Sequence, residues 1–590
     1  MPRIPSLLHS LLLRACLALV AFAPAASAQF AFVGPASDPA CNYHTIQEAV
    51  DAWAASSSTD YVDVFIANSQ TYTATAITIP TPVASTGMTL RGDLPTCHLG
   101  AASGHLVLDG GGNGNLPVID INATVAGDTQ RPKITLSYLD ITGGQHAGGN
   151  GGGVRVRGNA MVTIFETNVH GNSAANGGGI AVEATAAGVP NLIMVGNQVP
   201  AAIQDNHATQ DGGGLYCTNA SVYCDHYCLI SSNTAIGNGG GLAQQMCGTS
   251  IAPPRSSGVA DATVGLHLNS AGGDGGAAWI SGGYFHLFTN SPQRPAPVVG
   301  NVAGGSGGGL YFTGIGTDSN SHSGVQFDDN QAGVDGGAIY ADSGFLQLSE
   351  GGITGCGGNV NGCPRFRNNH AVHAGGAVAL SGSAGALLQE VTFADNSAAR
   401  ASVLQLGGPG FGFTLTNGHI AGNHGASELL LSAGGHIDLR YVTIADNGGD
   451  DDALIRFDTA GTFAASNSIL YDPNGAASGV VLDAPSGTEF HVNCVLLHED
   501  SGLAGKPGVT NLIVADPQWD TSGLYPAGIY VPGPDSPAVD ACGPGTGTIP
   551  DLLGGARPQD LSKPDGLGPY DMGAIERWPD DIFGDGFEQP

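Results

Sequence analysis

The sequence contains few basic residues. Lys and Arg together number 18, against 50 Asp and Glu, which gives a net charge of −32 at pH 7. Only three of the basic residues are lysines: Lys133, Lys506 and Lys563. Nucleic acids need a basic surface opposite their phosphates, so this balance excludes nucleic acid as a partner. It also disfavours anionic lipid surfaces and polyanionic sugars.

A long hydrophobic run is also missing beyond the first residues. The chain begins with Met1-Pro-Arg3, continues with an apolar stretch from Leu11 to Ala23, and then has Ala26-Ser27-Ala28. A basic start, a short apolar core and small residues predict a secretory signal peptide at residues 1–28. No later segment has the roughly 18 consecutive apolar residues of a membrane helix, so we expect no integral membrane span.

Cysteine is present in a number that fits an exported protein. Removal of the signal peptide with Cys16 leaves ten of the eleven cysteines, which predicts disulfides. We expect Cys356–Cys363 to close a short loop, and Cys41–Cys97 and Cys494–Cys542 to secure the two ends of the fold. A zinc site is the alternative for the cluster formed by Cys217, Cys224, Cys228, Cys247 and His226. Export and the lack of a Cys-x-x-Cys pair favour disulfides there.

Glycine is abundant, with 94 residues, and it belongs to an internal repeat. An apolar residue, two variable residues and an Asn recur with a mean period of about 31 residues. The ten asparagines are Asn172, Asn206, Asn233, Asn269, Asn301, Asn330, Asn369, Asn396, Asn423 and Asn447. From Asn206 to Asn369, the sixth following residue is always Gly, although the period varies. We interpret the Asn as a left-handed corner, and the Gly pair as a site of positive φ and close approach between coils.

Alternating apolar residues follow each Gly pair, as in Leu310-Tyr311-Phe312, and indicate a half-buried strand. A constant turn-and-strand unit with insertions between copies is typical of a solenoid. We therefore predict an all-β, right-handed parallel β-helix of about 13 coils and about 60 Å in length. A β-propeller is the alternative, but its blades repeat at roughly 40–45 residues.

The predicted domain order follows from where the repeat begins and ends. Residues 29–104 form an N-terminal cap and first coil, in which Thr45 to Glu48 is a capping box that starts a helix. Residues 105–515 are the β-helix, residues 516–577 a compact C-terminal cap, and residues 578–590 an acidic-aromatic tail.

Several of these segments resemble known families. Phe327 to Asn330 with Gly336 to Ile339 resembles the repeats of chlamydial polymorphic outer-membrane proteins, and Tyr43 to Val50 is similar to the first coil of pectin-lyase-like β-helix proteins. Ser536 to Asp540 with Asp571 to Glu576 looks like the end of bacterial β-helix proteins with interchangeable C-terminal anchors. These resemblances imply a β-helix secreted to, or displayed on, the surface of a Gram-negative bacterium, and they imply adhesion. The tail, Ile582 to Glu588, resembles an ending of exported gammaproteobacterial proteins.

Catalytic chemistry has few candidates in this sequence. Asp205, Asp329, Asp395 and Asp446 each precede a corner Asn, and Asp395 and Asp446 would lie about 10 Å apart, at the upper limit for an inverting glycosidase. The favoured interpretation is that all four are turn formers. The motifs of polygalacturonases and the basic clusters of lyases are absent. We assign no catalytic residue, no metal ligand and no cofactor.

An aromatic series is the candidate ligand-binding site. The tenth residue after the corner Asn is Tyr216, Ala243, Trp279, Tyr311, Tyr340 or Ala379 in six successive coils. Strand alternation points this position outward, so Trp279, Tyr311 and Tyr340 should form a surface column with rings about 5 Å apart. Such a column either stabilises the coils or, together with Tyr216, provides a platform for sugar rings.

The expected function is therefore a cell-surface binding or structural rod, an adhesin or glycan-binding protein whose partner is a glycan or host-surface polymer. The alternative is a polysaccharide lyase or glycoside hydrolase. Two or three carboxylates gathered in one outward groove would favour the enzyme.

Overall fold

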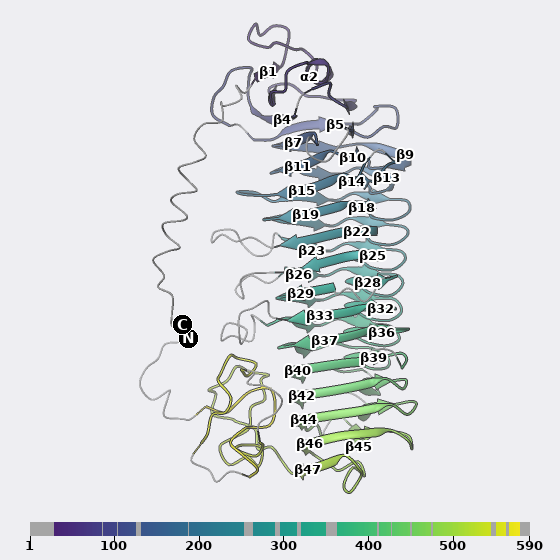
Figure 1. Cartoon of the computed structure of the whole chain (residues 1–590), viewed down its shortest axis with the longest axis vertical. Helices are drawn as coiled ribbons and strands as arrows, with labels where there is room; N and C mark the ends of the chain where they lie inside the picture. Colours follow the sequence, from purple (N-terminus) through teal and green to yellow (C-terminus); the bar gives the residue numbers. More distant parts are fainter. Residues whose placement is uncertain are drawn as a thin grey trace, which may run out of the picture.

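The protein is a long stack of parallel β-coils with one short helix at its N-terminal end (Figure 1). The computed structural model describes residues 29–578 except 85, 103, 126–130, 187, 253–263, 289–295, 315–319, 350–362, 410–411, 426, 449–450, 474–475, 544–549 and 562–565. The predicted signal peptide and all but the first residue of the tail therefore lie outside the described residues.

The strands form three parallel sheets, here called A, B and C. Sheet A contains β1 (Gln29–Val33), β2 (Val62–Ala67), β3 (Ile77–Pro80), β4 (Gly87–Leu94), β6 (Ile119–Ala123), β7 (Lys133–Ser137), β10 (Val154–Gly158), β11 (Met161–Phe165), β14 (Ile180–Glu183), β15 (Asn191–Val195), β18 (Leu215–Thr218), β19 (Ser221–Asp225), β22 (Leu242–Ala252), β25 (Ala278–Leu287), β28 (Leu310–Thr313), β32 (Ile339–Ala341), β36 (Val378–Leu380), β39 (Leu404–Leu406), β41 (Glu428–Ser432), β43 (Asp451–Phe457) and β45 (Ala476–Asp483).

Sheet B contains β5 (Leu106–Asp109), β8 (Leu139–Thr142), β12 (Asn168–His170), β16 (Ala201–Gln204), β20 (Cys228–Ser231), β23 (Gly265–His267), β26 (Ala296–Val299), β29 (Asn320–Ser323), β30 (Val325–Asp328), β33 (Phe345–Ser349), β34 (Arg365–Arg367), β37 (Gly385–Gln389), β38 (Thr392–Ala394), β40 (Gly412–Ala421), β42 (His436–Ala445), β44 (Thr462–Leu470), β46 (Glu489–Leu497) and β47 (Val509–Val514). Sheet C contains the short strands β9 (Gln145–Asn150), β13 (Ser173–Asn176), β17 (His207–Ala208), β21 (Thr234–Ala235), β24 (Ser270–Ala271), β27 (Val302–Ala303), β31 (Gln331–Ala332) and β35 (His370–Ala371).

Successive coils pair in register, which confirms the predicted parallel β-helix. In sheet B, one continuous ladder runs from β5 through β8, β12, β16, β20, β23, β26, β30, β34, β38, β40, β42, β44 and β46 to β47. These are fifteen strands of the described chain, against about thirteen expected coils. The expectation used the mean period of about 31 residues between Asn172 and Asn447, whereas the paired strands after Asn447 follow one another at shorter intervals.

Each corner Asn points into the protein and bonds the next coil. From Asn206 to Asn447, the Oδ1 atom of each corner Asn accepts the backbone N–H and the side-chain N–H of the preceding corner Asn at 2.9–3.1 Å. All ten asparagines are buried, at 0–2% exposure. Asp472 takes the next position and accepts the Asn447 amide, and burial raises the pKa of this carboxyl.

The left-handed corner was assigned to the wrong residue. The residue immediately before each Asn has positive φ, for example Asp205 at 54°, Asp395 at 56° and Asp446 at 48°. The Asn itself takes an ordinary conformation because its side chain is committed to the ladder. The Gly prediction is confirmed. Gly307 has φ 68°, and a Cβ on Gly308 would lie 2.2 Å from the Gly337 carbonyl oxygen of the next coil.

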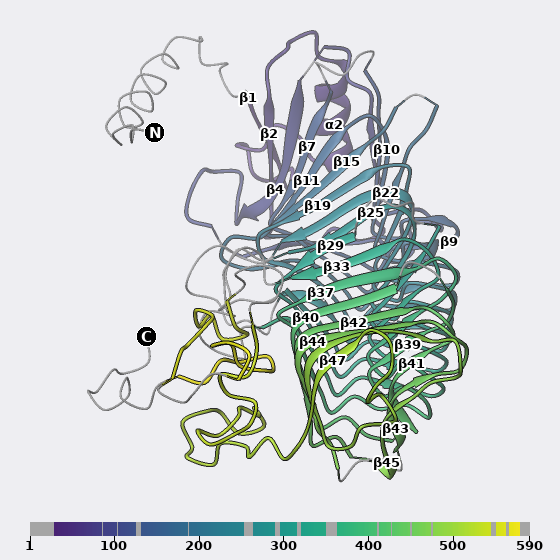
Figure 2. The same cartoon turned by 60° about the horizontal axis from the view of Figure 1, so that its bottom comes forward.

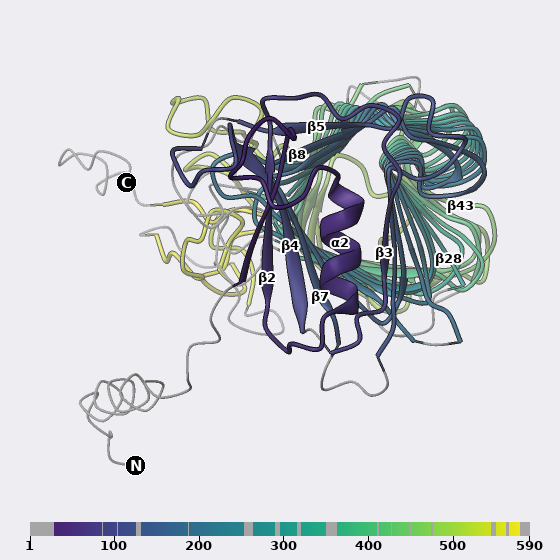
Figure 3. The ribbon, with the colours of Figure 1, turned by 90° about the horizontal axis from the view of Figure 1, so that it is seen from above.

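The N-terminal end carries the predicted helix. Thr45 and Glu48 form the capping box of α2 (Ile46–Ala55), whose buried face includes Ile46, Val50 and Trp53. Trp53 donates from Nε1 to the Gly87 carbonyl oxygen at 3.1 Å. Seen along the stack, α2 lies across the opening of the first coils (Figure 3). No helix in the described ranges has the length and apolar character of a membrane span.

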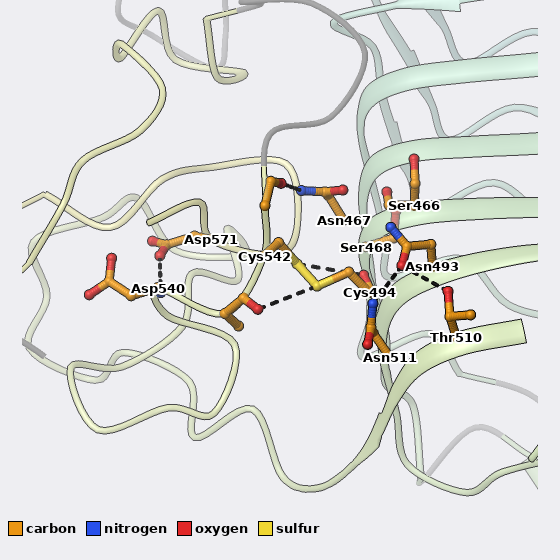
Figure 4. The surroundings of a disulfide bond; sticks show 12 residues. Ser466, Asn467, Ser468, Asn493, Cys494, Thr510, Asn511, Asp540, Cys542 and Asp571 are labelled. Atoms are coloured by element: carbon orange, nitrogen blue, oxygen red, sulfur yellow. Dashed lines mark hydrogen bonds between the residues drawn. A yellow bond between two sulfur atoms is a disulfide. The ribbon is translucent and has the colours of Figure 1, made fainter. Parts of the chain in front are cut away.

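The C-terminal segment, residues 516–577, packs against the side of the last coils rather than across their end (Figures 1 and 2). The Cys494–Cys542 disulfide joins it to β46, as predicted (Figure 4). Nearby, the Asn467 carbonyl oxygen accepts the Gly573 amide at 2.8 Å, and Asn417 donates to the Pro550 carbonyl oxygen at 2.6 Å. Cys494, Asn467 and Asn417 all have positive φ and lie where the strands of sheet B bend. These positions place polar groups on the flank, and the C-terminal segment bonds them there.

Of the other disulfide predictions, Cys41–Cys97 is confirmed. The four clustered cysteines form Cys217–Cys247 and Cys224–Cys228, which excludes them as zinc ligands. Cys363 is disulfide-bonded, whereas Cys356 lies outside the described residues, so this pairing stays a prediction.

The asparagine ladder predicts a large effect of a single substitution. Asn301→Ala removes four buried side-chain hydrogen bonds, to Asn269, Asn330 and the Leu266 carbonyl oxygen. Because the partners stay buried and unpaired, we expect the free energy of unfolding to fall by about 3 kcal/mol in urea denaturation. The control is Gln331→Ala, which removes an exposed side chain from the adjacent strand. Equal stabilities of the two variants would contradict the role of the ladder.

Candidate functional site

The aromatic column has the predicted register. Backbone pairing places Tyr216, Ala243, Trp279, Tyr311, Tyr340 and Ala379 opposite one another in successive coils of sheet A. The neighbours of these residues along each strand, such as Leu310 and Phe312, are buried in the core. Trp279, Tyr311 and Tyr340 are half-buried. The strands therefore direct these three side chains to the outer face.

Tyr311 and Tyr340 stack on each other. Their ring centroids are 5.0 Å apart with an interplanar angle of 13°. Tyr340 also exchanges a hydrogen bond with Ser381 at 2.8 Å, and burial raises the pKa of Tyr311. Because the two rings cover each other's faces, these stacked faces are not open to a sugar ring. This geometry favours a stabilising role for the tyrosines, and it makes Trp279 the main candidate for sugar contact.

Tyr216 does not join this column directly. Ala243 separates it from Trp279, and Tyr216 itself is only 9% exposed. Burial raises the pKa of its hydroxyl. The structure thus brings together three of the four candidate site residues.

A second site lies between the outer face of sheet B and the C-terminal segment. It is a hollow of about 320 Å³, called here the flank hollow. Its lining combines charged, polar and small residues: Arg365, Arg367, Thr392, Phe393, Ala394, Asp395, His419, Ala421, Gly422, Asp446, Ala527, Gly528, Ile529 and Tyr530.

Two of the aspartates that precede corner asparagines meet in this hollow. Asp395 and Asp446 occupy the same left-handed position two coils apart, and Gly422 occupies it in the coil between them. A Cβ on Gly422 would lie 3.0 Å from Asp395 Oδ1. The missing side chain therefore leaves open space between two exposed carboxylates.

His419 and Tyr530 form the wall on the C-terminal side. His419 Nε2 accepts the Tyr530 amide hydrogen at 3.1 Å, and the two rings stack with centroids 6.0 Å apart. The Tyr530 hydroxyl donates to Asp446 Oδ2. His419 is only 3% exposed, and burial lowers its pKa to about 4. The ring is therefore neutral at neutral pH and carries its proton on Nδ1.

Arginines border the hollow on the side of the preceding coils. Arg365 binds Asp328 through Nε at 3.0 Å, and Arg367 reaches the same carboxylate at 3.2 Å. Asp328 is buried and neutralises part of this charge. Neither arginine bonds Asp395 or Asp446 within the described part of the chain.

Sequence reasoning identified Asp395 and Asp446 but not the residues opposite them. Tyr530 lies 84 residues from Asp446, and nothing in its local sequence indicates that it folds back onto sheet B. One pattern in the sequence did indicate the hollow: the residues before three successive corner asparagines are Asp, Gly and Asp.

Metal sites are not indicated elsewhere. Within the described ranges, one group of potential ligands lies close together, Asp38, Cys41 and Cys97. Its two cysteines are joined in a disulfide and offer no thiolate.

Comparison with known proteins supports the fold and the repeat. The model of the Chlamydia polymorphic membrane protein repeat matches residues 324–342. No curated protein and no solved structure matches the chain. The matched residues contain Phe327, Asn330 and Gly336, which form one coil of the ladder. The chain is thus a parallel β-helix protein that carries a repeat of the chlamydial surface-protein type.

The buried His419 predicts pH-dependent stability. Its folded pKa of about 4 lies below the ordinary value of 6.5, so the stability it confers is present above pH 6.5 and is lost as the pH falls toward 4. Protonation of the unfolded state at His419 should lower the free energy of unfolding of the parent by about 2–3 kcal/mol between pH 7 and pH 4. We expect the His419→Gln variant to lack this part of the pH dependence. Urea denaturation at both pH values measures the difference. Identical pH dependence in parent and variant would show that His419 titrates normally.

Proposed function

We propose that this chain is an exported β-helix rod that is displayed on the cell surface and binds a glycan polymer, as an adhesin or glycan-binding protein. The match to a repeat of chlamydial membrane proteins and the disulfides support display outside the cytoplasm. The observation that carries the binding proposal is the outward column of Trp279, Tyr311 and Tyr340.

The column suits an extended polymer better than a small molecule. Its three aromatic residues follow the axis of the stack at the spacing of successive strands, roughly 4.8 Å. Trp279 offers the largest apolar ring, while Tyr311 and Tyr340 add ring edges and hydroxyl groups that bond sugar hydroxyls. Tyr216, the fourth candidate, lies further along the same sheet, but it is buried and separated from Trp279 by Ala243, so we leave it out of the proposed contact line. The net charge of −32 disfavours a polyanionic ligand.

The second candidate function is that of a glycoside hydrolase or polysaccharide lyase. The observation in its favour is that Asp395 and Asp446 line one hollow. Two coils correspond to about 10 Å, slightly beyond the separation in inverting enzymes. A lyase of this fold would need a free basic residue beside acidic calcium ligands, whereas Arg365 and Arg367 both bind Asp328. Binding is therefore the better supported function.

Trp279→Ala should weaken retention on an immobilised glycan by about fivefold or more, because it removes the largest aromatic ring of the column. The fold should stay intact, because this ring is only half-buried and lies on the outer face. Retention of the mature protein on a glycan array and its thermal midpoint measure the two effects. The matched control is Tyr223→Ala, which removes an exposed aromatic ring of sheet A outside the column. Unchanged retention of the Trp279 variant would exclude the column as the binding surface.

We expect no turnover of plant cell-wall polymers by the mature protein. The two aspartates of the flank hollow lie two coils apart, a spacing of about 10 Å, and both arginines bind Asp328, which disfavours hydrolysis and elimination. Assays for reducing ends and for unsaturated products test this expectation. Turnover that Asp395→Ala abolishes would establish an enzyme instead.

A further inference from the structure

We propose that the flank hollow is a binding subsite for a short stretch of uncharged saccharide. This inference rests on the proposed glycan-binding function and assigns it a second contact, on a different sheet from the aromatic column. The volume of about 320 Å³ lies at the lower end for ligand pockets, which suits one or two sugar units.

The hollow contains polar groups that lack protein partners. Thr392 is only 8% exposed, and its hydroxyl makes no hydrogen bond to the described residues. His419 uses Nε2 to accept the Tyr530 amide, so its Nδ1–H group is a second donor of the lining without an acceptor among the described residues. Both groups belong to residues that line the hollow, so they can bond the hydroxyl groups of a ligand.

Acceptors face these donors from the exposed rim. The Asp395 carboxylate has no protein partner among the described residues, and Asp446 bonds the Tyr530 hydroxyl through Oδ2. A sugar hydroxyl both donates and accepts, so adjacent hydroxyls satisfy a carboxylate and a buried donor together. This mixture of unpaired donors and acceptors matches a polyol better than a purely apolar or purely anionic ligand.

Shape and charge restrict the ligand further. Gly422 keeps the space between the two carboxylates open, since any side chain there would meet Asp395. Asp395 and Asp446 do not belong to the group of closely spaced potential metal ligands found in the described ranges, so a cation is not the favoured ligand. The two arginines share the Asp328 carboxylate, and Asp395 and Asp446 add two negative charges, so the net charge of these five groups is −1 and disfavours uronic acids and sulfated sugars.

Titration calorimetry of the mature protein with cellotriose, maltotriose and mannotriose tests the proposal, with trigalacturonic acid as the charged comparison. We expect millimolar or tighter binding of at least one neutral trisaccharide. Thr392→Val and Asp395→Asn should each weaken that binding about tenfold, because each removes or weakens one hydrogen bond. Asp205→Asn is the matched control, since Asp205 has the same left-handed corner conformation outside the hollow.

The trisaccharides separate this inference from the proposed function, because they are too short to depend on the whole aromatic column. Polymer retention without trisaccharide binding, or binding that both hollow variants leave unchanged, would overturn the subsite and leave the column intact. Binding of trigalacturonic acid alone would overturn the assignment to uncharged sugar. Trisaccharide binding that survives Trp279→Ala but fails in both hollow variants would support the subsite independently of the column.

Discussion

A buried amide that bonds from coil to coil fixes the register of this protein. Each corner Asn accepts two hydrogen bonds from the coil before it and donates to that coil's carbonyl oxygen. A shift of the coil by one residue would leave this buried amide without hydrogen-bond partners. The free-energy penalty of the unpaired amide exceeds the stabilisation from most single apolar contacts, so the register is fixed. The Gly pair then lets adjacent coils approach closely. Loops of different lengths can be inserted elsewhere without disturbing this unit.

Both candidate surfaces follow from that register. The tenth position after each Asn projects outward on sheet A, which aligns Trp279 with Tyr311 and Tyr340. The position immediately before each Asn must take positive φ, which Asp and Gly tolerate. Asp395, Gly422 and Asp446 therefore meet a backbone requirement and, through the same geometry, border an open hollow. The structural role of these residues is compatible with the binding role that we propose for them.

Local sequence was sufficient for the parts of the structure that repeat. The period, the Gly offset and strand alternation predicted the parallel β-helix, and the capping box predicted α2. The same local reasoning misassigned the left-handed corner, because Asn and the preceding Asp both tolerate that conformation. The two residues differ only in the folded structure, where the Asn side chain is buried in the hydrogen-bonded ladder and the preceding residue takes the left-handed conformation. The sidewise position of the C-terminal segment could not be predicted either, since it depends on polar groups that lie on the flank at Asn417 and Asn467. Tyr530 reaches the flank hollow through this non-repeating contact, so the hollow was not visible in the sequence as a site.

The central claim is that a rod built on this ladder presents surfaces that bind uncharged glycan. A glycan array probed with the mature, disulfide-bonded protein tests it most directly. The account predicts retention on at least one class of extended, neutral glycan, with little binding to sulfated or uronic-acid polymers. Absence of retention on every neutral glycan, or retention on polyanions alone, would contradict it.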